Sequence, residues 1–290
     1  MGLNNYPPDS RPTVKIYSSA NYFTLSLVDG LLPQFCKVEI VTKEQERWRQ
    51  LTKYLIDNNS FTINSENEQN KHCDYIIGCF IDEIDLDIIK NVIKEASQLS
   101  TKTIFIFPYN QNAQQYEKII KTKELLNQSS NENLFVYVGD HLGPRMTFDG
   151  SPFSQLIKNT LLTQKVPIPK NCDYFPVFTP EATKEIVKLL FSFGPPANEV
   201  AIYSEGLSPQ ELYLRLTKRI PNKEFVLENN KEALVNDSFF LIKTEHKLES
   251  SLNEVFQWFS KNPLYIPNIT KQSTPKETNK PTVTFKKPSV

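Results

Sequence analysis

The absence of glycine between Gly2 and Gly30 constrains this chain more than any other feature. The stretch holds an apolar candidate strand at 13–17, then a turn, then a candidate helix at 22–34. In many α/β proteins this strand, turn and helix carry a glycine-rich sequence, which lets backbone amides approach the diphosphate of a dinucleotide. Here Tyr22 and Phe23 stand in that region, and neither leaves the space open. The sequence therefore predicts a dinucleotide-binding type of scaffold whose diphosphate position is filled.

The first half of the chain alternates between short apolar runs and helical periods. The candidate strands lie at 13–17, 37–42, 61–64, 74–80, 103–107 and 134–138. The candidate helices lie at 22–34, 44–57, 84–99, 113–128 and 151–163. Continuous apolar strands separated by helices are typical of a parallel sheet that is covered on both faces. We expect an α/β fold with a Rossmann-like, doubly wound parallel sheet.

The second half is organised differently. A helix begins at Thr179, a short strand covers 200–203, and a helix with Ser208 as its N-cap follows. We expect the folded body to span 13–262, with a small C-terminal α/β lobe mainly at 165–262. Residues 1–12 are expected to be flexible. Residues 263–290 contain five prolines and one acidic residue, which predicts a disordered tail.

Composition and spacing exclude several classes of function. Lys+Arg and Asp+Glu are equal at 33 each, so we expect no basic surface for nucleic acid. The four cysteines form no C-x-x-C pair, and we expect no metal site. No apolar run is long enough to span a membrane, and the first residues lack the apolar core of a signal peptide. We therefore expect a cytoplasmic protein without a membrane span.

Several short segments occur in the order in which one known family carries them. They are 27–32, 74–77, 136–145 with its Gly143-Pro144-Arg145, 178–190, 208–212, and 252–263 with its Trp258-Phe259. In this order and spacing the chain resembles the extended short-chain dehydrogenase/reductases, the NAD-dependent epimerase/dehydratase group that acts on nucleotide sugars. The resemblance covers residues 13–263.

The resemblance implies a catalytic set that this chain keeps only in part. Enzymes of the family transfer a hydride to or from a nicotinamide, using a tyrosine, a lysine four residues later and an upstream serine. Tyr116 fits the tyrosine position, Ile120 falls at the lysine position, and Phe107-Pro108 fall at the serine position. Tyr116 is therefore expected to be a vestigial catalytic residue of a degenerate member.

The cofactor positions also depart from the family pattern. Lys43 follows the second strand, where an NAD enzyme normally has an aspartate for the ribose, and Phe80 follows the fourth strand in place of small residues. We therefore expect no bound cofactor and no residue dedicated to one. If Ile120 faces the filled position, it should be buried against Tyr22, Phe23 or Phe80.

Arg145 is the remaining candidate for ligand binding. Its guanidinium suits bidentate recognition of the diphosphate in a nucleotide-sugar-like ligand, and a structural ion pair is the other interpretation. The leading hypothesis is a non-catalytic pseudoenzyme that acts as a binding, scaffold or regulatory protein. The alternative is an active nucleotide-sugar epimerase, dehydratase or reductase with an atypical NAD(P) site. The resemblance also implies a homodimer, or a heterodimer with an active paralogue.

Overall fold

The computed structural model describes residues 11–65, 72–127, 132–146, 148, 152–192, 196–229 and 239–262. Residues 1–10 of the flexible segment expected at 1–12 lie outside these described residues, and so does the disordered tail expected at 263–290.

Up to residue 138 the elements follow the order predicted from the sequence. They are β1 (Thr13–Ser18), α1 (Tyr22–Leu31), the 3-10 helix η2 (Leu32–Gln34), β2 (Lys37–Val41), α2 (Gln45–Leu51), the 3-10 helix η3 (Lys53–Leu55), β3 (Phe61–Asn64), β4 (Tyr75–Cys79), α3 (Leu86–Leu99), β5 (Lys102–Pro108), α4 (Ala113–Leu126) and β6 (Asn133–Val138). The later elements are β7 (Asp140–Leu142), α5 (Pro152–Leu162), β8 (Lys165–Pro169), β9 (Pro176–Phe178), α6 (Thr179–Phe191), β10 (Glu199–Tyr203), α7 (Pro209–Arg219), β11 (Glu224–Glu228), β12 (Phe240–Lys243) and α8 (Leu248–Lys261).

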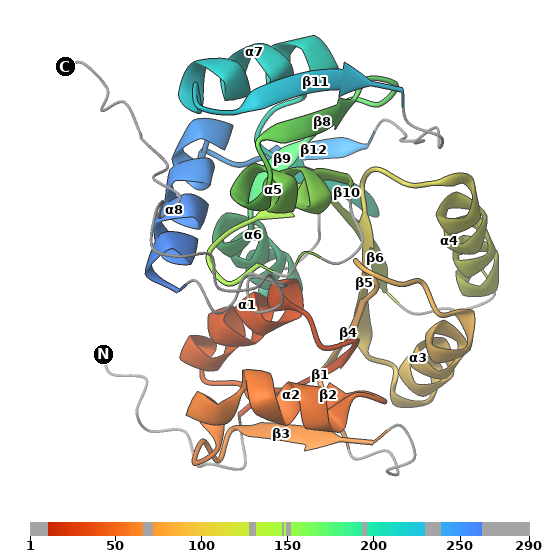
Figure 1. Cartoon of the computed structure of the whole chain (residues 1–290). Coiled ribbons are helices and arrows are strands. Elements are labelled where there is room, and N and C mark those ends of the chain that lie inside the picture. The colour runs from red at the N-terminus through yellow and green to blue at the C-terminus, as the bar shows by residue number, and fades with distance from the viewer. Residues whose placement is uncertain are drawn as a thin grey trace.

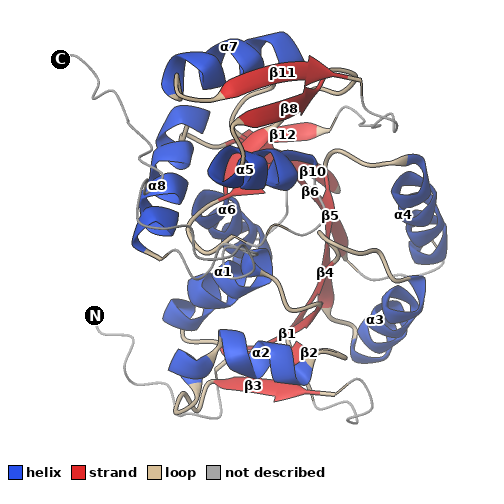
Figure 2. Cartoon of the chain, in the orientation of Figure 1, coloured by secondary structure: helices blue, strands red, loops and turns tan. Residues whose placement is uncertain are grey.

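The central sheet has eight strands in the order β12-β10-β6-β5-β4-β1-β2-β3, and every neighbouring pair is parallel. Helices α1 and α6 lie on one side of the sheet, and α3 and α4 lie on the other (Figure 1). Figure 2 shows the strands as the layer between these helices. The doubly wound parallel α/β fold that the sequence predicts is therefore confirmed.

Strand β1 shows how the sheet separates two apolar clusters. Val14 and Ile16 pack into the cluster that includes α1 and α6, whereas Tyr17 packs into the cluster that includes α3 and α4. This follows from the alternation of side chains along a strand. On the α3 side, the Lys15 ammonium and the Tyr17 hydroxyl both donate to the carboxylate of Glu95. All three side chains are buried, so this pair of charges is neutralised within the protein.

The C-terminal lobe is built on a parallel pair of strands, β8 and β11, and on a separate apolar cluster with residues from α5, α7 and α8. Strands β10 and β12 instead join the central sheet, and α6 packs against α1. The chain between 165 and 262 therefore passes repeatedly between the lobe and the central sheet.

The strands that sequence patterns did not predict are β7, β8, β9, β11 and β12. Strand β8 reads Lys-Val-Pro-Ile-Pro, and proline argues against a strand because it donates no hydrogen bond to the ladder. It is tolerated here because β8 pairs only with β11. Strands β7 and β9 have three residues each, too few for an alternating pattern to be recognised.

Candidate functional site

The sheet changes its direction of growth between β1 and β4. From β1 the strands continue outward through β2 and β3, and from β4 they continue through β5 and β6. In parallel α/β sheets, ligands bind beyond the carboxyl ends of the strands at such a switch point. The candidate site therefore consists of the residues that follow β1, β2 and β4, at 18–24, 42–44 and 80–85.

The turn between β1 and α1 is closed by side chains. Asn21 caps α1 with an extended φ of −136°, and its side chain accepts a hydrogen bond from the Thr24 amide at 2.8 Å. The hydroxyl oxygens of Ser18 and Thr24 lie 2.7 Å apart, and Thr24 donates to the Cys79 thiol at 3.3 Å. These four buried side chains connect β1, α1 and β4. Burial also raises the pKa of Cys79 to about 12, so this thiol is not a nucleophile near neutral pH.

A carboxylate already binds one backbone amide of this turn. The Ala20 N–H donates to Glu44 Oε2 at 2.6 Å, and Ala20 is itself buried. The other oxygen of Glu44, Oε1, lies 3.4 Å from Arg47 Nη1. Amides at this turn are the donors that a bound diphosphate requires. Glu44 thus satisfies the Ala20 amide from within the chain.

Two further contacts occupy the edges of the switch point. Lys43 Nζ lies 3.1 Å from Asp85 Oδ2, so an ion pair connects the end of β2 to the start of α3. Burial tends to raise the pKa of Asp85, but hydrogen bonds from Lys43 and the Ile88 amide hold it below its ordinary value. The buried Phe80 ring stacks on Phe107, with 5.8 Å between their centroids. Lys43 is therefore engaged in an ion pair, and Phe80 belongs to the apolar core.

Tyr116 lies in the first half of α4 and is half-buried. Its hydroxyl has no hydrogen-bond partner among the residues that the structure describes. The lysines nearest to Tyr116 in sequence are Lys118 and Lys121. Lys118 donates to the Ile84 carbonyl at 2.8 Å, and Lys121 is exposed.

The prediction that Ile120 is buried against Tyr22, Phe23 or Phe80 is wrong. Ile120 is only partly buried, and its neighbour Ile119 is the residue that packs into the buried cluster with Phe80. Tyr22 and Phe23 belong to α1, on the opposite face of the sheet from α4 (Figure 1). One residue turns a side chain by about 100° on an α-helix, and this rotation puts Ile119, not Ile120, towards the sheet.

Arg145 sits in a tight turn after β7. The Met146 amide donates to the Gly143 carbonyl at 3.2 Å, and Arg145 has a φ of 67°, a conformation that usually favours glycine. Arg145 Nη2 lies 3.0 Å from Asp29 Oδ2 on α1, and the Tyr54 hydroxyl donates to Asp29 Oδ1 at 2.5 Å. The Arg145 guanidinium is therefore paired within the chain and about two-fifths exposed.

Asp140 and His141, which begin β7, were not singled out by the sequence. Asp140 Oδ2 accepts from the Phe175 amide at 2.7 Å and from Asn110 Nδ2 at 3.3 Å, and burial raises the pKa of Asp140 to about 6. His141 packs edge-on against Phe23 at 5.4 Å, and burial lowers the pKa of His141 to about 4. The residues that contact these two side chains lie far away in sequence, so no local pattern predicts the contacts.

Two other features concern the described part of the chain as a whole. Within it, no group of three or more His, Cys, Asp or Glu side chains is arranged to hold a metal ion. Within the same residues, no helix has both the length and the apolar character needed to cross a membrane.

The fold and the switch point together define a class: a Rossmann-type α/β protein in which side chains close the turn between β1 and α1. No protein-family model matches the chain, and no curated protein matches it in sequence. Its similarity to other proteins is therefore found at the level of structure.

The similar solved structures include a dehydratase, a reductase and an epimerase. TunA, an NAD-dependent NDP-hexosamine 5,6-dehydratase of tunicamycin biosynthesis, matches with a TM-score of 0.65 and 11% identity, over 87% of this chain and 98% of TunA. Yeast methylglyoxal/isovaleraldehyde reductase Gre2 with NADPH matches with a TM-score of 0.64 and 12% identity, over 88% and 100%. UDP-glucose 4-epimerase from Bifidobacterium longum with NAD+ and UDP matches with a TM-score of 0.59 and 12% identity, over 87% and 99%. At these identities the likeness is one of fold.

Proposed function

We propose that this protein is a non-catalytic relative of the epimerase/dehydratase enzymes and acts by binding another molecule. The contact that carries the proposal is the hydrogen bond between the Ala20 amide and Glu44 at 2.6 Å. An anionic side chain on that amide excludes a diphosphate by charge and by volume. The ion pair between Lys43 and Asp85 and the buried Phe80 ring support the same conclusion.

The catalytic positions support the proposal independently. A general acid or base needs a pKa near the working pH, and in this fold a neighbouring lysine lowers the pKa of the tyrosine. Ile120 stands at the position of that lysine, and Lys118 is engaged with a backbone carbonyl. Phe107 and Pro108 supply no hydroxyl at the position of the serine. Tyr116 therefore lacks the partners that would make it an effective acid or base.

Direct binding measurements test the proposal. NAD+, NADH, NADP+ and NADPH are titrated into the full chain by calorimetry, and UDP- and dTDP-sugars are incubated with the protein and followed by NMR. We expect neither saturable cofactor binding nor turnover. A dissociation constant below about 10 μM, or about −7 kcal/mol of binding free energy, would establish the alternative, an active enzyme with an atypical cofactor site.

A pair of variants tests whether Glu44 stabilises the turn and excludes a cofactor. Glu44→Ala should lower the free energy of unfolding by about 1 kcal/mol, because the buried Ala20 amide loses its acceptor while Glu44 itself is partly exposed. It should not create NAD(P) binding, because Phe80 and the side chains of the turn still fill the site. Glu46→Ala is the matched control, since Glu46 lies two residues further on, in α2, and is 75% exposed. Tight cofactor binding by Glu44→Ala would mean that this carboxylate alone closes an otherwise intact site.

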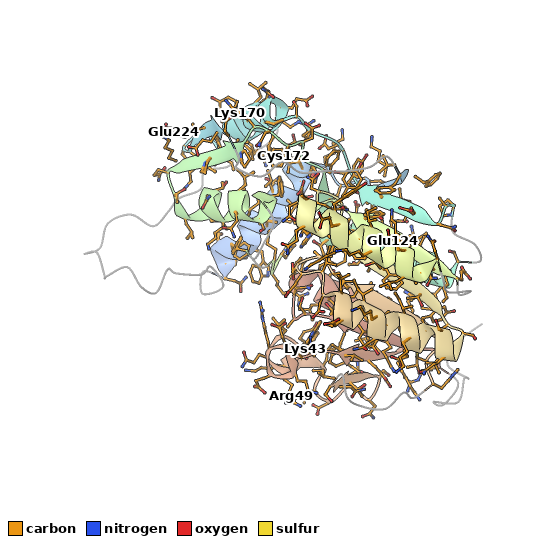
Figure 3. The ribbon with its side chains drawn as sticks, turned by 90° about the vertical axis from the view of Figure 1, so that its right-hand side faces the viewer. Lys43, Arg49, Glu124, Lys170, Cys172 and Glu224 are labelled. Carbon is orange, nitrogen blue, oxygen red and sulfur yellow. The ribbon has the colours of Figure 1, made fainter. Side chains whose placement is uncertain are left out.

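The dimer implied by the resemblance would use the helices around Tyr116. The exposed positions of these helices are polar or small: on α4 they include Glu117, Lys121 and Glu124, and on α3 they include Lys90 and Lys94. Figure 3 looks onto this side of the molecule and shows Glu124 on it. Stable dimer interfaces usually have an apolar core. We therefore expect sedimentation experiments over a wide concentration range to show no dimer held through α3 and α4.

Arg145 remains the best candidate for contact with an anionic, nucleotide-sugar-like ligand. It borders a groove with a volume of about 810 Å³, within the usual range for ligand sites. Any such ligand would have to compete with Asp29 for the guanidinium. Arg145→Lys should then weaken the binding of UDP or dTDP, since lysine cannot make the bidentate contact. Equal binding by the variant would exclude Arg145 as the recognition residue.

A further inference from the structure

The groove that Arg145 borders lies between α1 and α6. It has a volume of about 810 Å³, and its polar end begins beside the switch point, where Tyr22, Arg145 and Glu254 line it. From there it follows the two helices as far as Phe191, the last residue of α6. Figure 1 shows α1, α6 and α8 together on this side of the molecule. The groove therefore joins a polar end to a longer wall made by two helices.

The wall along α6 is apolar and already formed. Val187 and Phe191 line it, and Gly30 faces Val187 from α1. A Cβ added at Gly30 would lie 3.6 Å from Val187 Cγ2, so the glycine leaves room between the two helices. The Phe191 ring packs edge-on against Tyr75, with 5.3 Å between their centroids. A bound molecule would thus meet a preformed apolar surface, which is typical of small-molecule sites.

The cations around the groove differ in how far they are already neutralised. Arg145 is paired with Asp29 at 3.0 Å, and Lys188 is paired with Glu185 at 2.6 Å. Lys184 also lines the groove, one helical turn before Lys188. It is exposed and makes no ion pair with any residue that the structure describes. Lys184 is therefore the cation that is available to an anionic ligand.

Two carboxylates limit the charge that such a ligand can carry. Asp29 and Glu254 both line the groove. A diphosphate would bring at least two negative charges close to them, whereas a carboxylate brings one. Burial raises the pKa of Tyr22, so this side chain stays neutral and adds no further negative charge. The groove therefore favours a ligand with a single negative charge and an apolar body.

We propose that the groove binds an amphipathic carboxylate, with its head at Lys184 and its apolar body along Val187 and Phe191. Lys184 and Phe191 are seven residues apart on α6, about 10 Å along the helix axis, and a medium-chain fatty acid has a comparable length. This inference rests on the proposed function, because it names the class of molecule that a non-catalytic binding protein of this fold would hold.

Binding of decanoate to the full chain tests the inference. Decanoate is titrated by calorimetry below its micellar concentration, and we expect saturation at one site. Decyltrimethylammonium has the same chain and the opposite charge, and it should not bind measurably. Lys184→Met should weaken the binding of decanoate about fivefold, the effect of losing an exposed ion pair. Lys121→Met is the matched control, because Lys121 is exposed on α4, on the other side of the sheet, and this variant should bind like the wild type.

A further variant tests the position of the apolar body. Gly30→Leu places a side chain between the two helices and should abolish saturable binding of decanoate, while the melting temperature stays the same or rises. Unchanged binding by this variant would overturn the inference, and so would equal affinities of Lys184→Met and Lys121→Met for decanoate. Binding of decyltrimethylammonium as tight as that of decanoate would also overturn it.

The same titrations separate this inference from the proposed function. Binding of UDP that depends on Arg145, without binding of decanoate, would overturn the inference and leave the proposed function standing. Turnover with NAD(P)H, together with binding of decanoate that depends on Lys184, would contradict the proposed function and still support the site in the groove.

Discussion

Asp140 should make the stability of this protein fall as the pH rises from about 4 to about 6. Burial raises the pKa of Asp140 from 3.8 to about 6, against the opposing effect of hydrogen bonds from the Phe175 amide and Asn110. A group with a raised folded-state pKa contributes stability that is complete below its unfolded-state pKa and is lost as the pH passes its folded-state pKa. A difference of about two pKa units corresponds to about 3 kcal/mol of unfolding free energy.

Asp140→Asn removes this titration and keeps an acceptor for the Phe175 amide. The unfolding free energy of the variant relative to the wild type should therefore increase by about 3 kcal/mol between about pH 4 and about pH 7. Urea unfolding followed by circular dichroism at both pH values measures this difference. Asp87→Asn is the matched control, because the Asp87 side chain is 84% exposed on α3. A difference between Asp140→Asn and wild type that is the same at both pH values would refute the reasoning.

The neighbouring His141 must be considered in the same experiment, because it acts in the opposite direction. Burial lowers the pKa of His141 from 6.5 to about 4, so its contribution is present above the unfolded-state pKa and is lost as the pH falls towards 4. Its imidazole and the Asp140 carboxylate contact different residues, Phe23 and Asn110 respectively. The two effects should largely cancel in the wild type, and Asp140→Asn should expose the acid sensitivity due to His141.

Further predictions concern single positions. On acidification to about pH 4, His141→Gln should lose less unfolding free energy than the wild type does. The same pH dependence of the unfolding free energy for both proteins, measured by urea unfolding, would contradict this prediction. Ile120→Lys should change the unfolding free energy by less than about 1 kcal/mol, because the side chain is only partly buried, and Tyr116→Phe should leave it nearly unchanged. A large loss of stability in thermal unfolding for either variant would contradict the placement of α4. Gly139→Ala should cost about 1–3 kcal/mol or more, because its Cβ would lie 2.1 Å from a carbonyl oxygen. Gly30→Ala should instead raise the unfolding free energy by about 0.5–1 kcal/mol, because Gly30 lies inside a helix and its added Cβ would lie 3.6 Å from the nearest atom, Val187 Cγ2.

The sequence alone determined the fold class and most of the first half of the sheet. The strands from β1 to β6 are short, continuous apolar runs, and burial on both faces of a sheet leaves such runs little alternative. The capping residues were equally local: Asn21 and Ser208 both cap helices through residues three positions later. The absence of glycine between Gly2 and Gly30 also predicted that side chains would close the first turn.

What closes the site was decided only by tertiary structure. Glu44 reaches the Ala20 amide across 24 positions, and Thr24 reaches Cys79 across 55. Neither contact has a signature in sequence, because a polar side chain finds its partner only after the strands have taken their places in the sheet. The orientation of Ile120 is a second example of what sequence does not decide. The sequence can be aligned to the family's catalytic positions, but a shift of one residue on a helix decides whether a side chain points to the sheet or away from it.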